Sequence, residues 1–293
     1  MTLPANPGSV SEGGLIPTEP SHLNAPTAPS MSIYSETETL SPQAEQPMEE
    51  VSSAVEAGRK RAPWMRMNWE DLLFMHWPVA PALLRKLLPE KVELETFDGK
   101  AWLGIVPFRM SGVGFRGLPN LPYASSFPEL NVRTYVNDGQ RSGVWFFSLD
   151  ATSRLAVWGG RVLYRLPYKK ASIDIDQDGH WIRYQSRRDT LGGKRIGLKV
   201  EYRPLGKTYS TAPGTLEHFL TARDCLFTQG ACGRIFRGDV RHPSWQLQTA
   251  QAIIHDNTMT APLGIELPSE CPVLHFSRRT RVVAWSLRER SRA

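Results

Sequence analysis

The chain has 293 residues, of which 41% are hydrophobic and 22% charged, and a net charge of +6. This composition supports a folded core, and no apolar run reaches the roughly 20 residues of a membrane-spanning helix. Three cysteines without a C-x-x-C pair argue against a disulfide framework and against a structural zinc site.

The first 60 residues are predicted to be a disordered acidic tail. The stretch from Met1 to Gly58 holds eight Glu, no Lys, Arg or Asp, and few large apolar residues, so it cannot bury enough apolar surface to offset the entropy of ordering. It lacks the basic and apolar regions of a signal peptide. We expect residues 61–293 to form one domain of a cytoplasmic protein with no membrane partner.

The remaining chain is strongly basic. Because the tail contributes eight negative charges to a total of +6, the rest carries +14. Such a body attracts anions, including nucleic acid and acidic metabolites. Its Arg and Lys residues form no basic block, however, so a basic soluble surface is favoured and no nucleic-acid partner is expected.

Two helices are predicted at the start of the domain. The first begins after Asn68, a plausible N-cap, and ends at Trp77 before Pro78. The second runs from Pro81 to Pro89, with a proline in its first turn. Strands are then predicted at 92–96 and 101–110, joined by a turn at 98–99.

A glycine-rich segment at 112–117 has the spacing G-x-G-x-x-G. A dinucleotide site would need a helix to begin there, with its N-terminus facing a pyrophosphate. Pro119 and Pro122 prevent that helix, so we reject the nucleotide interpretation.

Residues 126–136 predict a strand with one polar face. Side chains alternate along a strand, which places on this face Glu129, Asn131, Arg133 and Tyr135. The row suits either an ordinary solvated sheet face or the polar wall of an internal cavity.

The rest of the chain is predominantly strand in its pattern. Further strands are predicted at 144–149, 161–168, 171–176, 180–185, 198–203, 248–255 and 281–287, with a helix at 215–227. A hairpin turn is predicted at 177–179, between the strands 171–176 and 180–185. Many strands, few helices and no regular β-α alternation predict an α+β domain: a mostly antiparallel, curved sheet that closes towards a barrel, with a few flanking helices.

Five segments in order resemble one family: SFPELNVRTYV, GVWFFSLDA, LPYKKA, TLEHFLTARDCLF and HPSWQLQTA. They are similar to the YqjF-like family, domain of unknown function 2071, over about residues 68–285. That family is similar in fold to acetoacetate decarboxylase. The resemblance therefore implies a closed, cone-like β-barrel with an internal cavity.

The segment Pro167-Tyr168-Lys169-Lys170 resembles the lysine pair of acetoacetate decarboxylase, in which the first lysine forms a Schiff base with a keto acid. Such a lysine must be a neutral amine, which burial or a nearby cation favours. Only one of two adjacent strand residues faces a cavity. The resemblance favours Lys169 and unbroken alternation favours Lys170; we choose Lys169 because Pro167 allows a register break.

Two functions follow from these residues. In the first, a lyase acts on a small keto or carbonyl acid: Lys169 or Lys170 attacks the carbonyl, Arg133 holds the carboxylate and Glu129 donates a proton. In the second, the same fold binds a small anion without catalysis, through the polar face of 126–136 and Tyr168. A third alternative is that Glu129 and Arg133 pair with each other in a structural core.

We expect neither a metal nor a cofactor. The chain's histidines show no H-x-H or H-x-x-E-H spacing; the four considered as ligands are His76, His218, His242 and His255. No G-x-S-x-G elbow supports a serine hydrolase. The expected partner is a small carboxylate or carbonyl compound, and a homo-oligomer remains compatible with the sequence.

Overall fold

A computed structural model describes residues 62–118, 126–190 and 192–290. These residues belong to one compact unit, Gln46–Ala293. The predicted tail, 1–60, lies outside the described residues. None of the described helices is both long and apolar enough to cross a bilayer.

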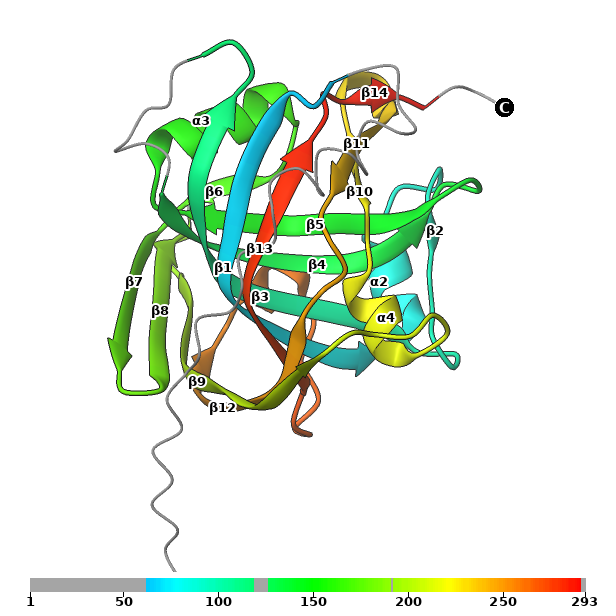
Figure 1. The fold of residues 1–293 in the computed structure, drawn as a ribbon. Coiled ribbons are helices and arrows are strands. Elements are labelled where there is room, and N and C mark those ends of the chain that lie inside the picture. The colour runs from blue at the N-terminus through cyan, green and yellow to red at the C-terminus, as the bar shows by residue number, and fades with distance from the viewer. Residues whose placement is uncertain (1–61, 119–125, 191, 291–293) are drawn as a thin grey trace, which may run out of the picture. The chain divides into compact units, whose positions relative to one another are not determined.

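Strands dominate the described part of the chain (Figure 1). In chain order they are β1 (Met65–Val79), β2 (Glu93–Leu94), β3 (Ala101–Phe115), β4 (Phe127–Asn137), β5 (Ser142–Ala151), β6 (Tyr168–Lys170), β7 (Ser172–Asp178), β8 (Trp181–Asp189), β9 (Arg195–Tyr209), β10 (Cys225–Gln229), β11 (Ile235–Arg241), β12 (Leu247–Asn257), β13 (Val273–Ala284) and β14 (Arg288–Glu289). The α-helices are α2 (Pro81–Arg85), α3 (Arg154–Leu163) and α4 (Leu216–Thr221), and two short 3-10 helices are η1 (Ala231–Gly233) and η2 (Ala261–Leu263).

The strands form one mixed sheet in the order β14-β11-β10-β5-β4-β3-β1-β13-β12-β9-β8-β7. Most neighbours are antiparallel, but β5 pairs in parallel with both β6 and β10. Strand β11 also pairs with β13 through two residue pairs, so the sheet curves back on itself as a partial ring (Figure 1). The predicted α+β class with a curved, mostly antiparallel sheet is confirmed; a fully closed barrel stays a prediction.

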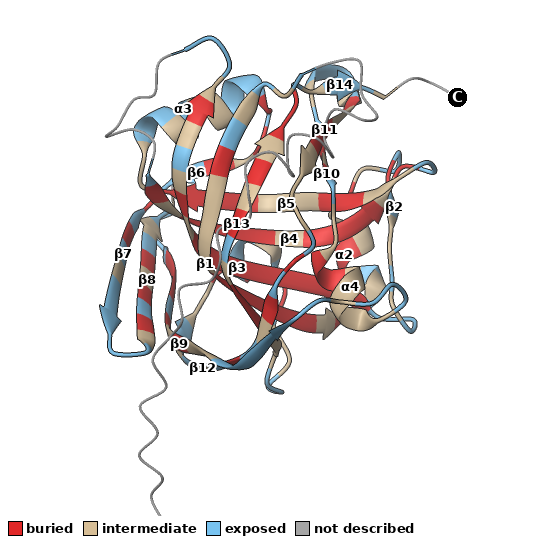
Figure 2. Cartoon of the chain, in the orientation of Figure 1, coloured by how far each residue is buried: buried red, intermediate tan, exposed pale blue. Residues whose placement is uncertain are grey.

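The middle of the sheet is buried on both faces (Figure 2). On β4, Leu130 and Val132 join one apolar cluster with residues of β1, β3, β8 and β9. On the other face, Phe127 joins a second cluster that includes Phe74, Phe108 and residues of α3. Burial on both faces explains why the central strands read as nearly continuous apolar runs.

The predicted helix after Asn68 is wrong, because this segment lies within β1. Strand β1 pairs with β3 on one side and with β13 on the other. Leu72 to Met75 are four consecutive buried residues, as expected of a strand covered on both faces. Asp71 has a positive φ of 53°, and the pairing with β3 shifts register around it. Cross-strand pairing along the whole segment outweighs the local helical pattern.

The predicted strand 161–168 is also wrong over most of its length. Residues 154–163 form α3, whose N-cap Ser153 accepts a hydrogen bond from the Ala156 amide at 3.2 Å. Arg165 has a positive φ of 52°, and β6 begins only at Tyr168. The Ser153 cap was a local helix signal that the sequence analysis did not use.

The predicted helix 215–227 is correct only at its start. Thr215 caps α4, which ends at Thr221, and the rest of the segment enters β10. Strand β10 pairs with β11, an element that the sequence analysis did not predict. The position of a partner strand decides where this helix stops.

Several local predictions are confirmed. The β7–β8 hairpin turns at Gly179. Helix α2 begins at Pro81 as predicted but ends at Arg85, before the predicted Pro89. Asp98 and Gly99 both have positive φ, as a two-residue hairpin turn requires. Segment 112–117 begins no helix, because β3 continues through Phe115.

Candidate functional site

The polar face of β4 is buried rather than solvated. The register pairs Glu129 with Phe108, Asn131 with Val106, and Arg133 with Gly104, so these side chains share one face. Glu129, Asn131 and Tyr135 are buried, and Arg133 is partly exposed. This burial does not fit an ordinary solvated sheet face, which was one of the two interpretations of this strand.

Glu129 is a buried carboxyl group with one side-chain partner. The Tyr168 hydroxyl donates a hydrogen bond to its Oε2 at 2.9 Å. Burial, with a smaller contribution from the nearby Asp150 carboxylate, raises the pKa of Glu129 from 4.5 to about 8, against the opposing effect of the hydrogen bond from Tyr168. Glu129 is therefore predominantly protonated at neutral pH and can donate a proton.

Arg133 carries a positive charge that no described carboxylate pairs with. Its Nη2 donates to the backbone carbonyl of Leu220 at 3.2 Å, and its Nε is buried without a partner. The guanidinium carbon lies 5.5 Å from the centre of the Phe74 ring and 5.8 Å from that of Tyr135. Because Glu129 bonds to Tyr168, the structure does not contain the Glu129–Arg133 pair considered above.

His76 and Tyr135 form a buried pair beside Arg133. The Tyr135 hydroxyl donates to the Leu220 carbonyl at 2.7 Å and lies 2.7 Å from His76 Nε2. Since that hydroxyl proton is already used, we assign the proton on His76 to Nε2 and leave Nδ1 as an acceptor. Burial lowers the pKa of His76, and the Arg133 charge lowers it further, so the ring is neutral.

Gly104 makes room for this arrangement. It lies between His76 on β1 and Arg133 on β4 in the register of the sheet. A Cβ atom at this position would lie 3.0 Å from the His76 ring and 3.3 Å from Arg133 Cγ. Because glycine has no Cβ atom, the side chains of His76 and Arg133 can both lie close to the backbone at this position.

The C-terminal end of α4 covers the same face. Its Leu220 carbonyl accepts from both Arg133 and Tyr135, and the Thr221 carbonyl accepts from Trp245 Nε1 at 2.8 Å. Carbonyl groups at a helix end attract a cation. The helix therefore helps to hold the Arg133 side chain in place.

Several buried polar atoms of β1, β4 and β13 have no hydrogen-bond partner among the described residues. They are Asn131 Oδ1, His76 Nδ1, His275 Nδ1 and Ser277 Oγ. Buried polar groups are normally paired, so a cluster of unpaired ones is typical of a site that takes a polar ligand or water.

The lysine pair lies at the edge of this region. Tyr168 faces inward, but Lys169 and Lys170 are both exposed. Lys170 Nζ donates to the Ala171 carbonyl at 3.0 Å. Lys169 is paired with Asp150 in the register of β5 and β6. Burial raises the pKa of Asp150 to about 6, although the positive charges of Arg188 and Lys169 act in the opposite direction.

The structure therefore brings together some, but not all, of the expected site residues. Tyr168 meets Glu129, and Arg133 meets Tyr135, whereas the lysines remain outside. His76 was considered only as a metal ligand and was set aside for lack of ligand spacing, so its contact with Tyr135 was not predicted. The buried ion pair between Asp150 and Arg188, at 2.7 Å, was not predicted either, because the sequence contains no spacing signal for it.

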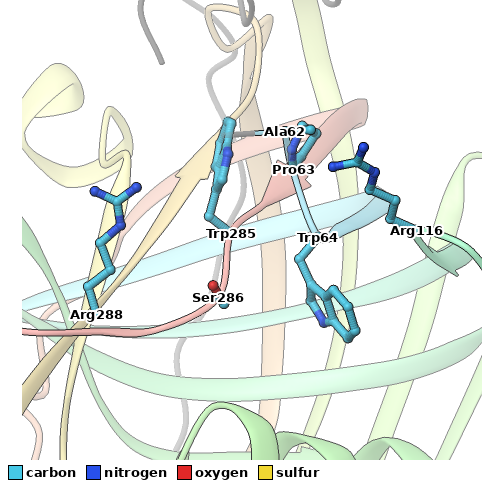
Figure 3. A pocket seen from close by; sticks show the side chains of 7 residues that line it. All are labelled: Ala62, Pro63, Trp64, Arg116, Trp285, Ser286 and Arg288. Carbon is cyan, nitrogen blue, oxygen red and sulfur yellow. The ribbon is translucent and has the colours of Figure 1, made fainter. Parts of the chain in front are cut away.

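A separate pocket of about 310 Å³ lies near the start of β1 (Figure 3). Its lining includes Trp64, Arg116, Trp285 and Arg288, with the two arginines on opposite sides of Trp285. It contains none of the expected site residues. Among the described residues, no group of three or more His, Cys, Asp or Glu could hold a metal ion.

Comparison of solved structures identifies the fold. Acetoacetate decarboxylase from Legionella pneumophila has a TM-score of 0.53 at 14% identity, over 86% of this chain and 98% of its own. The enduracididine biosynthesis enzyme MppR, solved in complex with pyruvate, has a TM-score of 0.53 at 11% identity, over 80% of this chain and 93% of its own. At such identities the likeness concerns the fold alone, and the expected acetoacetate decarboxylase-like fold is confirmed.

Comparison of sequences identifies the family. The family model for domain of unknown function 2071, described as an uncharacterized conserved protein, matches residues 66–281. The uncharacterized protein YqjF of Bacillus subtilis strain 168 is 40% identical over 225 residues, which are 77% of this chain and 92% of YqjF. The chain belongs to the domain of unknown function 2071 family.

Proposed function

We propose that this protein binds a small carboxylate on the inner face of β4, with Arg133 as the contact for the anion. The observation that carries the proposal is the partly buried guanidinium with an unpaired Nε and no described carboxylate beside it. A cation in such surroundings is stabilised by an anionic ligand. Arginine also offers two parallel donors that match a carboxylate.

The neighbouring groups favour a ligand that has further polar atoms. Glu129 is protonated near neutral pH and can donate to a keto or hydroxyl oxygen. The unpaired Nδ1 of His76 and Oδ1 of Asn131 can accept from a hydroxyl group. A keto or hydroxy acid is therefore the best chemical match. The structural neighbour MppR was solved with pyruvate, which supports this class.

The direct test is calorimetric titration of the full chain with pyruvate, acetoacetate, lactate and a neutral ketone. We expect the acids to bind and the ketone not to bind. R133M should weaken binding at least about tenfold, because a charge-assisted hydrogen bond contributes roughly 1.5–3 kcal/mol. The matched control is R116M, which removes an exposed arginine of the separate pocket and should bind as the wild type does.

Two outcomes would reject the proposal. One is no measurable binding of any acid to protein that circular dichroism shows to be folded. The other is unchanged affinity in R133M. Loss of binding in both arginine variants would instead indicate a general charge effect rather than a site at Arg133.

A second candidate function is catalysis through a Schiff base. The observation that favours it is the adjacency of Lys169 to Tyr168, whose hydroxyl contacts the proton donor Glu129. Borohydride trapping with the same keto acids, followed by peptide mass spectrometry, tests it. A reduced adduct on Lys169 or Lys170 would identify the reactive amine, and K169A and K170A would each remove their own adduct. No adduct on folded protein would eliminate this mechanism and leave binding alone.

A cytoplasmic location fits both functions. Cys225, Cys232 and Cys271 are all free, and the last two are exposed. Exposed free thiols are typical of a reducing compartment.

A further inference from the structure

Helix α3 exposes an apolar stripe to solvent. Leu155, Trp158 and Val162 are 54%, 61% and 55% exposed, and Leu163 is 44% exposed. The first three have the i, i+3, i+7 spacing of a single helix face. Figure 2 shows exposed residues along α3. Single exposed apolar residues are ordinary, but a cluster of four on ten residues is typical of an interaction surface.

The opposite side of α3 is already packed against the domain. Val157 is buried, and Gly160 lies against the ring of Tyr168 on β6. Arg161 Nε also donates to the Tyr168 carbonyl at 2.8 Å. The inner side of the helix therefore already packs on the domain. The apolar outer stripe is an additional surface that the rest of the domain does not cover.

Exposed basic residues flank the stripe in the sequence. The segment 152–171 contains no Asp or Glu. Its basic residues are all exposed, namely Arg154, Arg161, Arg165, Lys169 and Lys170. A helix that combines exposed Trp, Leu and Val with flanking Arg and Lys has the composition of helices that lie in a membrane interface.

We propose that α3 docks the protein on an anionic membrane surface. The apolar stripe would enter the boundary between headgroups and acyl chains, and the five cations would contact anionic headgroups. A helix that lies flat needs no membrane-spanning length. The expectation of no membrane partner, which was drawn from the lack of a span, therefore does not apply to it. This inference does not depend on the proposed ligand site.

A second copy of the chain fits the same surface less well. A two-fold contact through α3 would bring two copies of the same basic segment to one interface, and like charges at an interface are unfavourable. A standard interface also buries roughly 800 Å² on each partner, of which four partly exposed side chains on a ten-residue helix supply only a part. Charge complementarity therefore selects an anionic surface.

The test is flotation of the full chain with vesicles of phosphatidylcholine alone and with about 30% phosphatidylglycerol. We expect binding to the anionic vesicles only, decreasing as salt rises from about 0.05 to 0.5 M because screening weakens the headgroup attraction. The variant W158S/V162S should lose at least about tenfold in the partition coefficient, because two apolar side chains no longer enter the interface.

The matched control is L205S/I253S, which removes two other exposed apolar side chains, 38% and 47% exposed, from β9 and β12. It should bind vesicles as the wild type does. Equal binding to neutral and anionic vesicles, or unchanged binding in W158S/V162S, would overturn the proposal. Absence of vesicle binding, together with a dimer in light scattering that W158S/V162S dissociates, would overturn it in favour of a second copy.

Discussion

Glu129 and Arg133 lie four residues apart on one face of β4, yet their surroundings leave them in opposite states. Burial and the Asp150 charge keep Glu129 protonated, with Tyr168 as its partner. The Arg133 guanidinium donates a hydrogen bond to a backbone carbonyl and lies over two aromatic rings. A neutral acid and an unpaired cation on one inner surface are complementary to a ligand that has both a carboxylate and an oxygen acceptor.

The raised pKa of Glu129 has a consequence for stability. The folded protein holds a proton that the unfolded chain releases above its ordinary pKa of 4.5. Its contribution to the free energy of unfolding is therefore full below that pH, and it is lost as pH rises towards about 8. E129Q cannot titrate, so its free energy of unfolding should decrease less steeply than that of the wild type between pH 6 and 8, by at most about 1.4 kcal/mol per pH unit.

Urea unfolding at closely spaced pH values measures this difference. The interval above pH 6 is chosen because Asp150, with a pKa of about 6, contributes mainly below it. E266Q changes an exposed glutamate and should keep the pH dependence of the wild type. Parallel curves for wild type and E129Q would show that Glu129 is ionised in the folded protein, and the assigned proton donor would be wrong.

At the scale of elements, α3 packs closely on β6 at one glycine, Gly160. Gly159 and Gly160 are adjacent in α3, but only Gly160 lies against the domain. A methyl group there would overlap the Tyr168 ring, which is buried and held by its hydroxyl on Glu129. A methyl group at Gly159 would meet no atom within 4 Å.

The two glycines should therefore respond in opposite directions to the same substitution. G160A is expected to lower the free energy of unfolding by about 1–3 kcal/mol, because the ring and the helix must separate. G159A should raise it by up to about 1 kcal/mol, because alanine favours the helix. Urea unfolding of both variants at one pH measures the pair. Equal effects would mean that α3 does not pack on Tyr168 in this way.

The elements differ in how much their local sequence decides. The turn at Asp98–Gly99 and the hairpin at Gly179 were predicted correctly, because residues that favour positive φ specify a turn locally. Strand β1 was not, because its apolar residues fit a helix as well as a strand with two buried faces. The choice depends on β3 and β13, which pair with it from distant parts of the chain.

At the scale of the molecule, the sheet has a protected middle and an exposed end. Strands β3 and β4 are paired on both sides and buried on both faces (Figure 2). Strand β7 ends the sheet, pairs only with β8 among the described strands, and has mostly exposed residues. Strand position should therefore control local stability.

Hydrogen exchange followed by mass spectrometry should reveal this order. We expect amides of 172–178 to exchange much faster than those of 127–137, which should open only with global unfolding. Both segments pair in antiparallel fashion, so a difference in the type of strand pairing cannot cause the expected difference in exchange rate. Equal protection would mean that the sheet unfolds as one unit without an open edge.

The sequence alone determined the fold class, the family and the polar face of β4. The family rests on the resemblance of five sequence segments to its members. The fold class and the polar face rest on the strand pattern, local turns and the period-two alternation of strands, which act over a few residues. Tertiary structure decided which polar residues meet. Tyr168 reaches Glu129 across 39 positions, and Tyr135 reaches His76 across 59. Such contacts, and the exposure of both lysines, depend on how strands distant in sequence pair and how the sheet curves, because local propensity carries no information about a partner elsewhere in the chain.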